Sequence, residues 1–307
     1  MKRFLILLFI PLLLCSCIKN ERDFNDTTII FTDATGYPVK LPDSPKKVAV
    51  LFSSLADIWV SAGGEIAVTV FESVERGFAR KDTLLVDGGA GKSIDNEALI
   101  ASSPDLVICS ADIAAQLDTA SICRDIGIPV LSLRIESFED YLNILKLFTT
   151  ITENKAKFTE NGVAVKKEIE KIQKDTYDTS YLFIRAASSA KSTKAKNAAN
   201  HFVCAMLDEL GAHNIAEKAS ILLDGISFEE VLLQDPEYIF ISTMGDESAA
   251  KEYMSSLLES DEWSALTAVK RGNVHYLPKD MFQYKPNSRW DEAYHYLANI
   301  LKGSADK

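Results

Sequence analysis

Positive charge is scarce in this chain and forms no long basic run. The 307 residues include 33 Lys and Arg against 44 Asp and Glu, which gives a formal net charge of −11. A nucleic-acid-binding surface needs local positive charge to displace the counterions of the phosphates. An acidic chain without a long basic run therefore excludes DNA and RNA as partners.

Signatures of common enzyme classes are also missing. The sequence has no Gly-x-Ser-x-Gly nucleophile elbow, no Gly-x-x-x-x-Gly-Lys phosphate loop and no paired-histidine metal motif. The histidines are dispersed along the chain: His201, His213, His275 and His295. A zinc or manganese site needs several ligands that converge on one ion, which this dispersion disfavours. We expect a protein that is not an enzyme and that needs no cofactor.

Cysteine is sparse beyond the N-terminus. Cys109, Cys123 and Cys204 lie in apolar or helical contexts, without the Cys-x-x-Cys or Cys/His spacing of a metal site. Cysteines in such contexts are typically buried free thiols, which is what we expect here. An oxidised pair of Cys109 and Cys123 remains open at this level.

No apolar run is long enough to span a bilayer. The N-terminal run from Phe4 to Leu14 has about eleven residues, whereas a bilayer core requires about twenty. Lys2 and Arg3 precede it, and this is the layout of a secretory signal peptide. We expect residues 1–16 to be removed on export.

The end of that segment, Leu14-Cys15-Ser16-Cys17, resembles the bacterial lipobox. The resemblance implies that the thiol of Cys17 receives a diacylglyceryl group, with Cys15 as the alternative acceptor. A small residue directly before Cys17 and a leucine three positions upstream favour Cys17. Such an anchor would hold the folded body at the extracytoplasmic side of a cell membrane through a polar tether, residues 17–27.

Beyond the tether, short apolar strands alternate with helices. A hairpin is predicted within residues 28–41, and strands and helices then alternate. Continuous apolar strands interleaved with helices indicate parallel sheets covered on both faces. The Glu- and Lys-rich residues 153–175 predict one long helix, which is either a bridge or a peripheral helix. We expect an α/β protein with two Rossmann-like lobes, residues 28–152 and 176–307, joined by that helix.

An internal repeat supports two lobes of one design. Residues 94–110 align without gaps onto residues 226–242, with identical Ile, Glu, Pro and Ser at four matched positions. Each copy predicts a short helix with Glu97 or Glu229 near its start, a proline that ends it, and a buried strand. The alternative is chance similarity, because the order helix, proline, strand is common.

These segments resemble a known family, the helix-bridged (class III) periplasmic substrate-binding lipoproteins of ABC importers for iron siderophores, haem and cobalamin. The resemblance extends over residues 28–302 and is concentrated in three segments: residues 31–42, 45–54 and 97–108. It implies a ligand cleft between the lobes, and docking of Glu97 and Glu229 on arginines of the membrane permease. From the residues alone, each glutamate is also suited to stabilising its helix N-terminus.

Loops at the carboxyl ends of strands predict the ligand site, because open α/β sheets bind ligands there. That rule selects the following candidates: Ser53, Ser54, Arg76, Arg80, Gly88, Gly89, Ser110, Arg185, Lys194 and Thr243. In the loop 186–200, Lys191, Lys194 and Lys196 concentrate positive charge on an acidic protein. Such a loop suits an anionic group of the ligand; a merely solvated loop is the alternative.

The segment 277–290 adds two further candidates because it is rich in aromatic, proline and cationic residues. Tyr284 is suited to stacking on, or coordinating, a large metal chelate. Arg289 offers a planar fork to a carboxylate. Phe282 and Trp290 are expected to pack against the C-terminal lobe instead.

Together these features predict a function. We expect a monomer, anchored to the membrane, that captures an iron chelate or haem and delivers it to an ABC permease and its ATPase. A cobalamin-binding protein of the same fold, or a sensor or adhesion lipoprotein, are the alternatives. A stiff helix between the lobes should keep their movement small.

Overall fold

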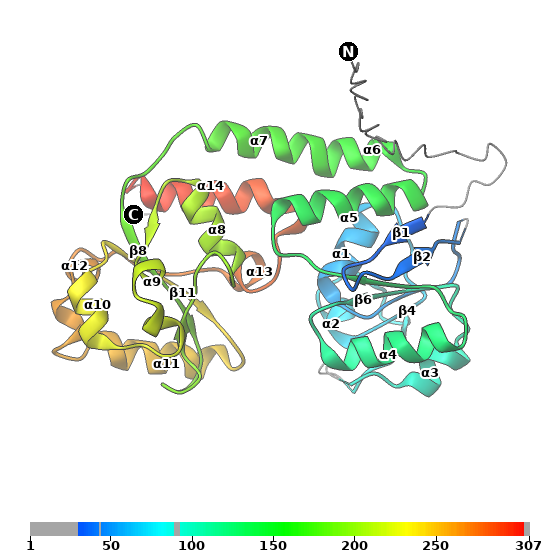
Figure 1. Ribbon diagram of the computed structural model, residues 1–307, viewed down its shortest axis with the longest axis horizontal. Coiled ribbons are helices and arrows are strands. Elements are labelled where there is room, and N and C mark those ends of the chain that lie inside the picture. The colour runs from blue at the N-terminus through cyan, green and yellow to red at the C-terminus, as the bar shows by residue number, and fades with distance from the viewer. Residues whose placement is uncertain (1–29, 43, 89–92, 304–307) are drawn as a thin grey trace, which may run out of the picture.

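The computed structural model describes residues 30–42, 44–88 and 93–303. The predicted signal peptide, Cys17, the whole predicted tether and Gly89 lie outside the described residues. Figure 1 shows two lobes side by side, with helices running along one side of both. Within the described ranges, no helix combines the length and the apolarity that crossing a bilayer requires.

The N-terminal lobe is built on a five-stranded parallel sheet with the order β5-β4-β3-β6-β7. The strands are β3 (Val48–Val50), β4 (Val68–Thr69), β5 (Leu84–Leu85), β6 (Leu106–Ser110) and β7 (Val130–Leu133). The central strand β3 and its neighbour β6 are fully buried, as helices on both faces require. The helices are α1 (Ser53–Ser61), α2 (Phe71–Glu75), α3 (Asn96–Ala101), α4 (Ala114–Asp125) and α5 (Phe138–Ile151).

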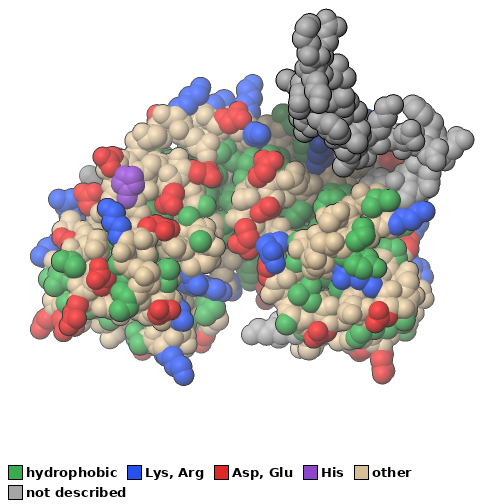
Figure 2. All heavy atoms as spheres, in the orientation of Figure 1, with side chains coloured by type: hydrophobic (Ala, Val, Ile, Leu, Met, Phe, Trp, Pro, Cys, Tyr) green, Lys and Arg blue, Asp and Glu red, His purple; other side chains and the backbone are tan. Residues whose placement is uncertain are grey.

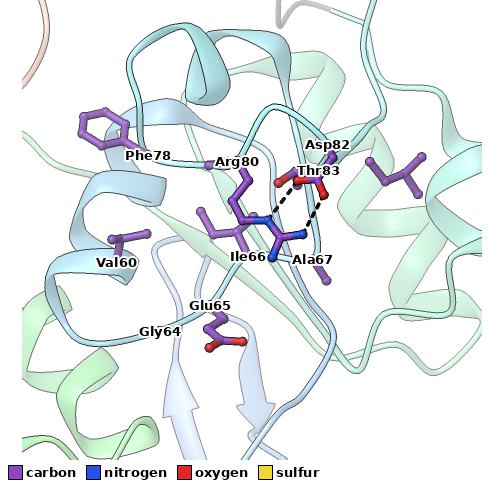
Figure 3. A pocket seen from close by; sticks show the side chains of 11 residues that line it. Val60, Gly64, Glu65, Ile66, Ala67, Phe78, Arg80, Asp82 and Thr83 are labelled. Atoms are coloured by element: carbon purple, nitrogen blue, oxygen red, sulfur yellow. Dashed lines mark hydrogen bonds and ion pairs between the residues drawn. The ribbon is translucent and has the colours of Figure 1, made fainter.

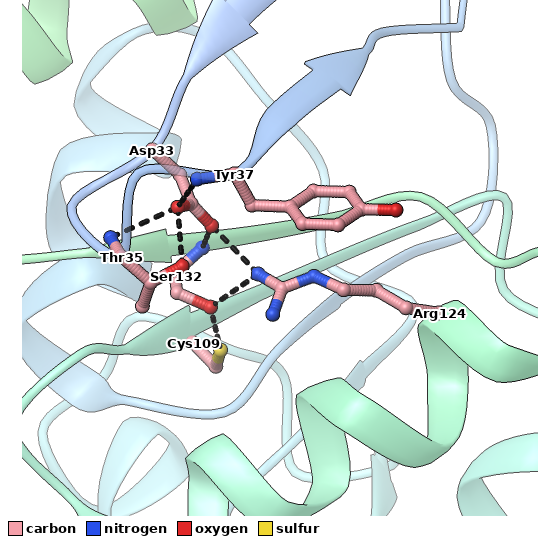
Figure 4. A network of polar contacts seen from close by, with 6 residues as sticks. All are labelled: Asp33, Thr35, Tyr37, Cys109, Arg124 and Ser132. Carbon is pink, nitrogen blue, oxygen red and sulfur yellow. Dashed lines mark hydrogen bonds and ion pairs between the residues drawn. The ribbon is translucent and has the colours of Figure 1, made fainter.

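A hairpin of β1 (Ile30–Thr32) and β2 (Pro38–Lys40) is fastened to the β7 edge of this sheet. Figure 4 shows the connection: Asp33, in the hairpin turn, accepts hydrogen bonds from Arg124 Nη2 at 2.6 Å and from the backbone N of Ser132 at 3.1 Å. Cys109 lies beside Ser132, with 3.5 Å between Sγ and Oγ. The hairpin thus covers the β7 edge of the sheet, whose backbone groups would otherwise be unpaired.

The C-terminal lobe repeats this plan. Its parallel strands have the order β10-β8-β11-β12, and β9 pairs antiparallel with β8. The strands are β8 (Ser180–Ala186), β9 (Lys194–Ala195), β10 (His213–Asn214), β11 (Tyr238–Thr243) and β12 (Val274–Tyr276). The longer helices are α8 (Phe202–Glu209), α10 (Phe228–Gln234), α11 (Glu247–Leu258) and α14 (Trp290–Leu301). The predicted α/β architecture with two Rossmann-like lobes is confirmed.

The smaller helices of this lobe are mostly single turns. They are α9 (Ile215–Lys218), η2 (Ser220–Leu223), η3 (Trp263–Ala265), α12 (Thr267–Lys270), α13 (Lys279–Phe282) and η4 (Asn287–Arg289). Two of them, α13 and η4, form the segment that leads from β12 into α14. This segment returns the chain from the C-terminal sheet toward the N-terminal lobe (Figure 1).

One helical stretch occupies the middle of the chain. It consists of α6 (Lys155–Phe158), the π-helical turn η1 (Thr159–Val163) and α7 (Ala164–Ile172). Backbone angles at both junctions are right-handed helical, so the stretch is unbroken. It packs against α14 and, in Figure 1, extends across both lobes. The domain boundaries at residues 152 and 176 stay predictions.

One hydrophobic cluster fills the inner faces of both lobes. It includes Val50 and Ile108 from the N-terminal sheet, Tyr181 and Phe240 from the C-terminal sheet, and residues of α5, α7 and α14. Two further clusters fill the outer faces. Pulling the lobes apart would expose apolar surface at about 25 cal/mol per Å², so the shared core opposes wide separation.

The two copies of the repeat have matching local structure. Asp95 and Ser227, at matched positions, each accept a hydrogen bond from the backbone N three residues on, at 3.0 and 3.5 Å. Ser103 and Asp235 are also matched, and both have positive φ, 50° and 38°, directly before the proline. Helix cap, left-handed turn and buried strand therefore recur together in the two lobes.

Candidate functional site

Sheet topology gives each lobe one point where the strand order reverses. In the N-terminal lobe this point lies between β3 and β6, and in the C-terminal lobe between β8 and β11. The crevice of an open α/β sheet lies outside the carboxyl ends of such strands. Figure 2 shows the furrow where the two lobes meet. The candidate side chains nearest the reversal points come from α1, α2, β8, β9 and the segment between β12 and α14.

Arg76 joins the two lobes at this site. Its Nη1 donates a hydrogen bond to Ser53 Oγ at 2.8 Å, and its guanidinium carbon lies 4.0 Å from the centre of the Tyr284 ring. Ser53 in turn donates to the carboxylate of Glu72. The Phe78 ring contacts the same guanidinium, at 4.8 Å. Three candidates that lie far apart in the sequence, Ser53, Arg76 and Tyr284, are thus brought together.

Burial shapes the charge of Arg76. It lowers the pKa of the guanidinium, while the nearby carboxylates of Asp57 and Glu72 oppose that shift. The guanidinium remains charged at neutral pH because the ordinary pKa of arginine is above 12. An aromatic ring on a partly desolvated cation is a favourable contact. Arg76 is therefore held in place by the protein itself.

Asn287 provides a second connection between the segment before α14 and α1. Its Nδ2 donates to the carbonyl oxygen of Ser54 at 2.9 Å and to Asp57 Oδ2 at 2.8 Å. Asn287 is fully buried and has φ of 53°, a left-handed conformation that asparagine adopts more readily than most residues. Burial raises the pKa of Asp57, although the hydrogen bond from Asn287 opposes this shift. Neither Asn287 nor Asp57 was among the sequence candidates.

Three cations from the C-terminal lobe lie on one face of the β8–β9 pair. Arg185 and Lys194 are direct cross-strand partners, and Lys196 follows two residues after Lys194, on the same side of the chain. Burial lowers the pKa of Arg185, and burial together with the charges of Arg185 and Lys194 lowers the pKa of Lys196. We call Arg185, Lys194 and Lys196 the cationic face. In the described part of the chain, no carboxylate forms an ion pair with any of them.

Lys285 extends this positive region toward the N-terminal lobe, and His201 lies nearby. Lys285 Nζ lies 4.6 Å from the centre of the Phe202 ring and 3.7 Å from Glu136 Oε2, which belongs to the N-terminal lobe. The His201 ring stacks on the Phe202 ring and lies tilted against the Phe183 ring. Burial lowers the pKa of His201 to about 3, assisted by the charges of Lys285, Arg185 and Lys196. His201 is therefore neutral at physiological pH.

Two predicted ligand residues are engaged elsewhere. Arg289 forms ion pairs with Asp280 and Glu292, both at 2.8 Å, so its planar fork is occupied by local carboxylates. Arg80 pairs with Asp82 at 2.7 Å and is largely exposed. Arg80 lines a cavity of about 540 Å³ beside α1 (Figure 3). This cavity lies at the beginning of β4 and β5, whereas the crevice expected for a ligand lies at the carboxyl ends of the strands.

The remaining candidates are mostly committed to structure. The backbone N of Ser110 donates to Gln116 Oε1 at 2.8 Å, and Gln116 Nε2 donates to the Leu51 carbonyl at 2.6 Å. This buried glutamine, which the sequence did not single out, links the ends of β6 and β3. Thr243 is buried at the end of β11, and Gly88 is exposed with open space around it.

Glu97 and Glu229 lie in the first turn of α3 and α10 and are exposed. Among the described residues, no group of three or more His, Cys, Asp or Glu side chains is placed to hold a metal ion. Cys109, Cys123 and Cys204 are free and buried. The described site thus offers cations, aromatic rings and hydroxyls.

Comparison with known proteins agrees with this fold. Over 274 residues the chain is 28% identical to the petrobactin-binding protein YclQ of Bacillus subtilis, with 85% of this chain and 79% of that protein covered. The crystal structure of YclQ has a TM-score of 0.69 at 21% identity, covering 92% of this chain and all of that one.

Two further crystal structures share the fold. Staphylococcus aureus SirA, complexed with staphyloferrin B, has a TM-score of 0.68 at 20% identity, with 90% of this chain and 99% of that chain covered. The vitamin B12 binding protein BtuF of Vibrio cholerae has a TM-score of 0.69 at 17% identity, with 87% and 100% covered. The model of the family described as "Periplasmic binding protein" matches residues 48–281. This chain therefore belongs to the periplasmic binding protein family.

Proposed function

We propose that this protein is the substrate-binding lipoprotein of an ABC importer and that its ligand is an anionic iron chelate. The ligand lies between the lobes, with its anionic groups on the cationic face and its body against Tyr284 and Phe202. The protein captures the ligand and hands it to a permease and its ATPase, as a monomer and without chemistry on the ligand.

The observation that carries this proposal is the unpaired cationic face. Side chains of like charge that are partly buried together repel one another; burial, and after it the charges of Arg185 and Lys194, lower the pKa of Lys196. An anion bound there removes that repulsion and accepts charge-assisted hydrogen bonds. The protein as a whole is acidic, so a local concentration of cations beside the furrow favours anionic ligands over neutral ones such as cobalamin.

The relatives support the ligand class without fixing the ligand. YclQ is a petrobactin-binding protein, SirA was crystallised with staphyloferrin B, and both share this fold. Tyr284 and Phe202 supply aromatic surface next to cations in this chain. A chelate that carries carboxylates and a flat or aromatic portion matches that combination.

Tryptophan fluorescence of the purified protein tests the proposal, because Trp290 packs against the Phe202 ring that lies beneath Lys285. Titrations with ferric petrobactin, ferric staphyloferrin B, haem and cyanocobalamin should give saturable quenching with an anionic iron chelate. Loss of one charge-assisted hydrogen bond amounts to about 1.5–3 kcal/mol. Arg185→Ala should therefore weaken binding about tenfold to a hundredfold.

Lys191→Ala provides the matched control. Lys191 is an exposed lysine of the same loop, outside the cationic face. This variant should bind with the affinity of the original protein. Tight binding of cyanocobalamin that is insensitive to Arg185→Ala would contradict the proposed ligand class and favour the cobalamin alternative. No response to any of the four probes would contradict capture of this kind altogether.

Glu97 and Glu229 are proposed to dock the protein on the permease. Both are exposed carboxylates at equivalent positions of α3 and α10, one in each lobe. Two such carboxylates on separate lobes suit a surface that presents two cations. Glu97→Ala and Glu229→Ala should each reduce transport while leaving ligand affinity unchanged.

The lipid anchor at Cys17 completes the proposal. A diacylglyceryl group on that cysteine would keep the protein at the extracytoplasmic face of the membrane that holds the permease. Metabolic labelling with palmitate should label the original protein and leave Cys17→Ser unlabelled. Labelling that persists in Cys17→Ser and disappears in Cys15→Ser would move the anchor to Cys15.

A further inference from the structure

The helix that carries Glu229 also exposes two leucines. Leu233 is 76% exposed and Leu232 is 45% exposed, although α10 covers an outer part of the C-terminal lobe. Glu229 and Leu233 are four residues apart, and residues at that spacing are neighbours on one helix face. A large apolar side chain therefore lies one turn away from an exposed carboxylate.

The internal repeat supplies a comparison for this surface within the same molecule. Leu99 and Val231 are matched in the repeat and both are fully buried, so α3 and α10 turn the same side toward their sheets. The residue matched to Leu233 is Ala101, which is also exposed. The N-terminal lobe thus presents a carboxylate with a small neighbour, and the C-terminal lobe presents a carboxylate with a large apolar neighbour.

We propose that Leu233, with Leu232 beside it, makes an apolar contact with the permease next to the ion pair of Glu229. This inference rests on the proposed docking of the two glutamates. The receiving surface combines a cation with an apolar hollow, because that pair complements a carboxylate and a leucine one helical turn apart. The half of the permease that receives the N-terminal lobe presents a cation without the hollow.

A contact of this kind orients the complex. Two lobes that docked through glutamates alone would present nearly the same charge to both halves of the permease, and the protein would fit in either direction. With Leu233 in the hollow, the reversed arrangement places Ala101 there and leaves apolar surface unfilled. Filling a hollow with a leucine side chain favours the correct arrangement by about tenfold or more.

The cognate permease–ATPase complex, reconstituted in nanodiscs, tests this inference. The measurement is the concentration of full-length, ligand-free binding protein that gives half-maximal stimulation of ATP hydrolysis. Leu233→Ala should raise that concentration about tenfold. Ile126→Ala removes an apolar side chain that is 53% exposed at the end of α4, outside both proposed docking helices, and should leave it unchanged.

Further variants distinguish failure of the apolar contact from failure of the docking itself. The exchange Ala101→Leu with Leu233→Ala moves the leucine to the other lobe, where the reversed complex inserts it into the hollow, so this double variant should recover most of the stimulation that Leu233→Ala loses. Stimulation that stays as weak as in Leu233→Ala alone would overturn the orienting role of the leucine. Weakening by Glu97→Ala and Glu229→Ala but not by Leu233→Ala would overturn the apolar contact and leave the docking intact. Stimulation unaffected by either glutamate variant would overturn the docking, and the apolar contact with it.

Discussion

The guanidinium carbon of Arg76 lies 4.0 Å from the centre of the Tyr284 ring. Arg76 directly follows α2 in the N-terminal lobe, and Tyr284 lies between α13 and η4, where the chain returns from the C-terminal sheet. The contact therefore forms only when the segment before α14 is seated against the N-terminal lobe. Asn287, three residues further, fixes the same segment to α1.

The first prediction concerns the energy of this contact. A cation beside an aromatic face contributes about 0.5–2 kcal/mol, more where the cation is desolvated. A double-mutant cycle of Arg76→Ala and Tyr284→Leu, measured by urea unfolding, should give a coupling energy in that range. Arg76→Ala with Phe282→Leu is the control cycle and should be additive, because in the described structure the Phe282 ring forms no cation–π contact with Arg76.

Asn287 should be sensitive to any substitution. Asn287→Ala removes two hydrogen bonds from a fully buried amide and places a less tolerant residue at positive φ. We expect a loss of about 3 kcal/mol in the free energy of unfolding. Asn287→Gly tolerates the backbone conformation but lacks the amide, so it should recover only part of the loss. Complete recovery with glycine would show that the hydrogen bonds to Ser54 and Asp57 contribute nothing.

Stability should decrease in mild acid because of His201. Its pKa is about 3 in the folded protein and about 6.5 in an unfolded chain, so the unfolded state binds the proton first. The contribution of His201 is complete above pH 6.5 and is lost as the pH falls toward 3. Between pH 7 and pH 5 the free energy of unfolding should fall by about 2 kcal/mol from this residue.

His201→Asn isolates that effect. His201 Nδ1 accepts the hydrogen bond from the backbone N of Val203 that caps α8, and asparagine can cap a helix without titrating. Urea unfolding of this variant at pH 7 and pH 5 should show a smaller difference than in the original protein. An identical pH dependence would assign the acid sensitivity to other groups.

Asp33, which fastens the β1–β2 hairpin to the sheet, should also make the stability of the protein depend on pH. Burial alone would raise the pKa of Asp33, but hydrogen bonds from Thr35, Ser132 and Tyr37 outweigh it and lower the pKa. The contribution of Asp33 is therefore present above its ordinary pKa near 4 and is lost as the pH falls below it. Asp33→Asn leaves Arg124 without its carboxylate and should cost about 3 kcal/mol at pH 7, by urea unfolding. An unchanged midpoint would show that the hairpin is not anchored through this residue.

Ligand binding should change the overall shape of the protein only slightly. The inner faces of the lobes share one hydrophobic cluster, and an unbroken helical stretch from Lys155 to Ile172 lies along them. Wide hinge motion would disrupt both. Small-angle scattering with and without the bound chelate should show little change in the radius of gyration. A large compaction would contradict this expectation.

The sequence predicted the architecture because its signals are local. Apolar runs such as the one in β6 and the helix–proline–strand repeat are visible without knowledge of any partner. Two-residue strands such as β5 and β10 were missed, since their apolar or polar character has no detectable period over so short a length. The helix α2 was hidden in the same way, between a strand and a turn.

The candidate site was only partly predictable, because its contacts join distant parts of the chain. Arg76 and Tyr284 were selected separately from different loops, and their contact could not be foreseen. Asn287 and Gln116 donate hydrogen bonds to backbone carbonyls that are far away in the sequence. Such hydrogen bonds produce no recognisable pattern in the neighbouring sequence. For Arg289 a signal was present: Glu292 lies three residues on in the following helix, a spacing at which opposite charges pair.

The π-helical turn Thr159–Val163 contains one residue more than an α-helical path would need, and the helix absorbs it without a break. In this turn the backbone carbonyl of Asn161 accepts a hydrogen bond from the Tyr141 hydroxyl at 2.8 Å. The side-chain Nδ2 of Asn161 donates a hydrogen bond to the backbone carbonyl of Ser61, also at 2.8 Å. Deleting one residue within this turn would restore an α-helical path and leave the residues beyond it in nearly the same orientation, whereas a deletion in the regular turns of α7 would rotate everything beyond it by about 100°. A one-codon deletion is thereby tolerated at the π-helical turn, while elsewhere in this stretch it would turn the C-terminal lobe away from the N-terminal lobe.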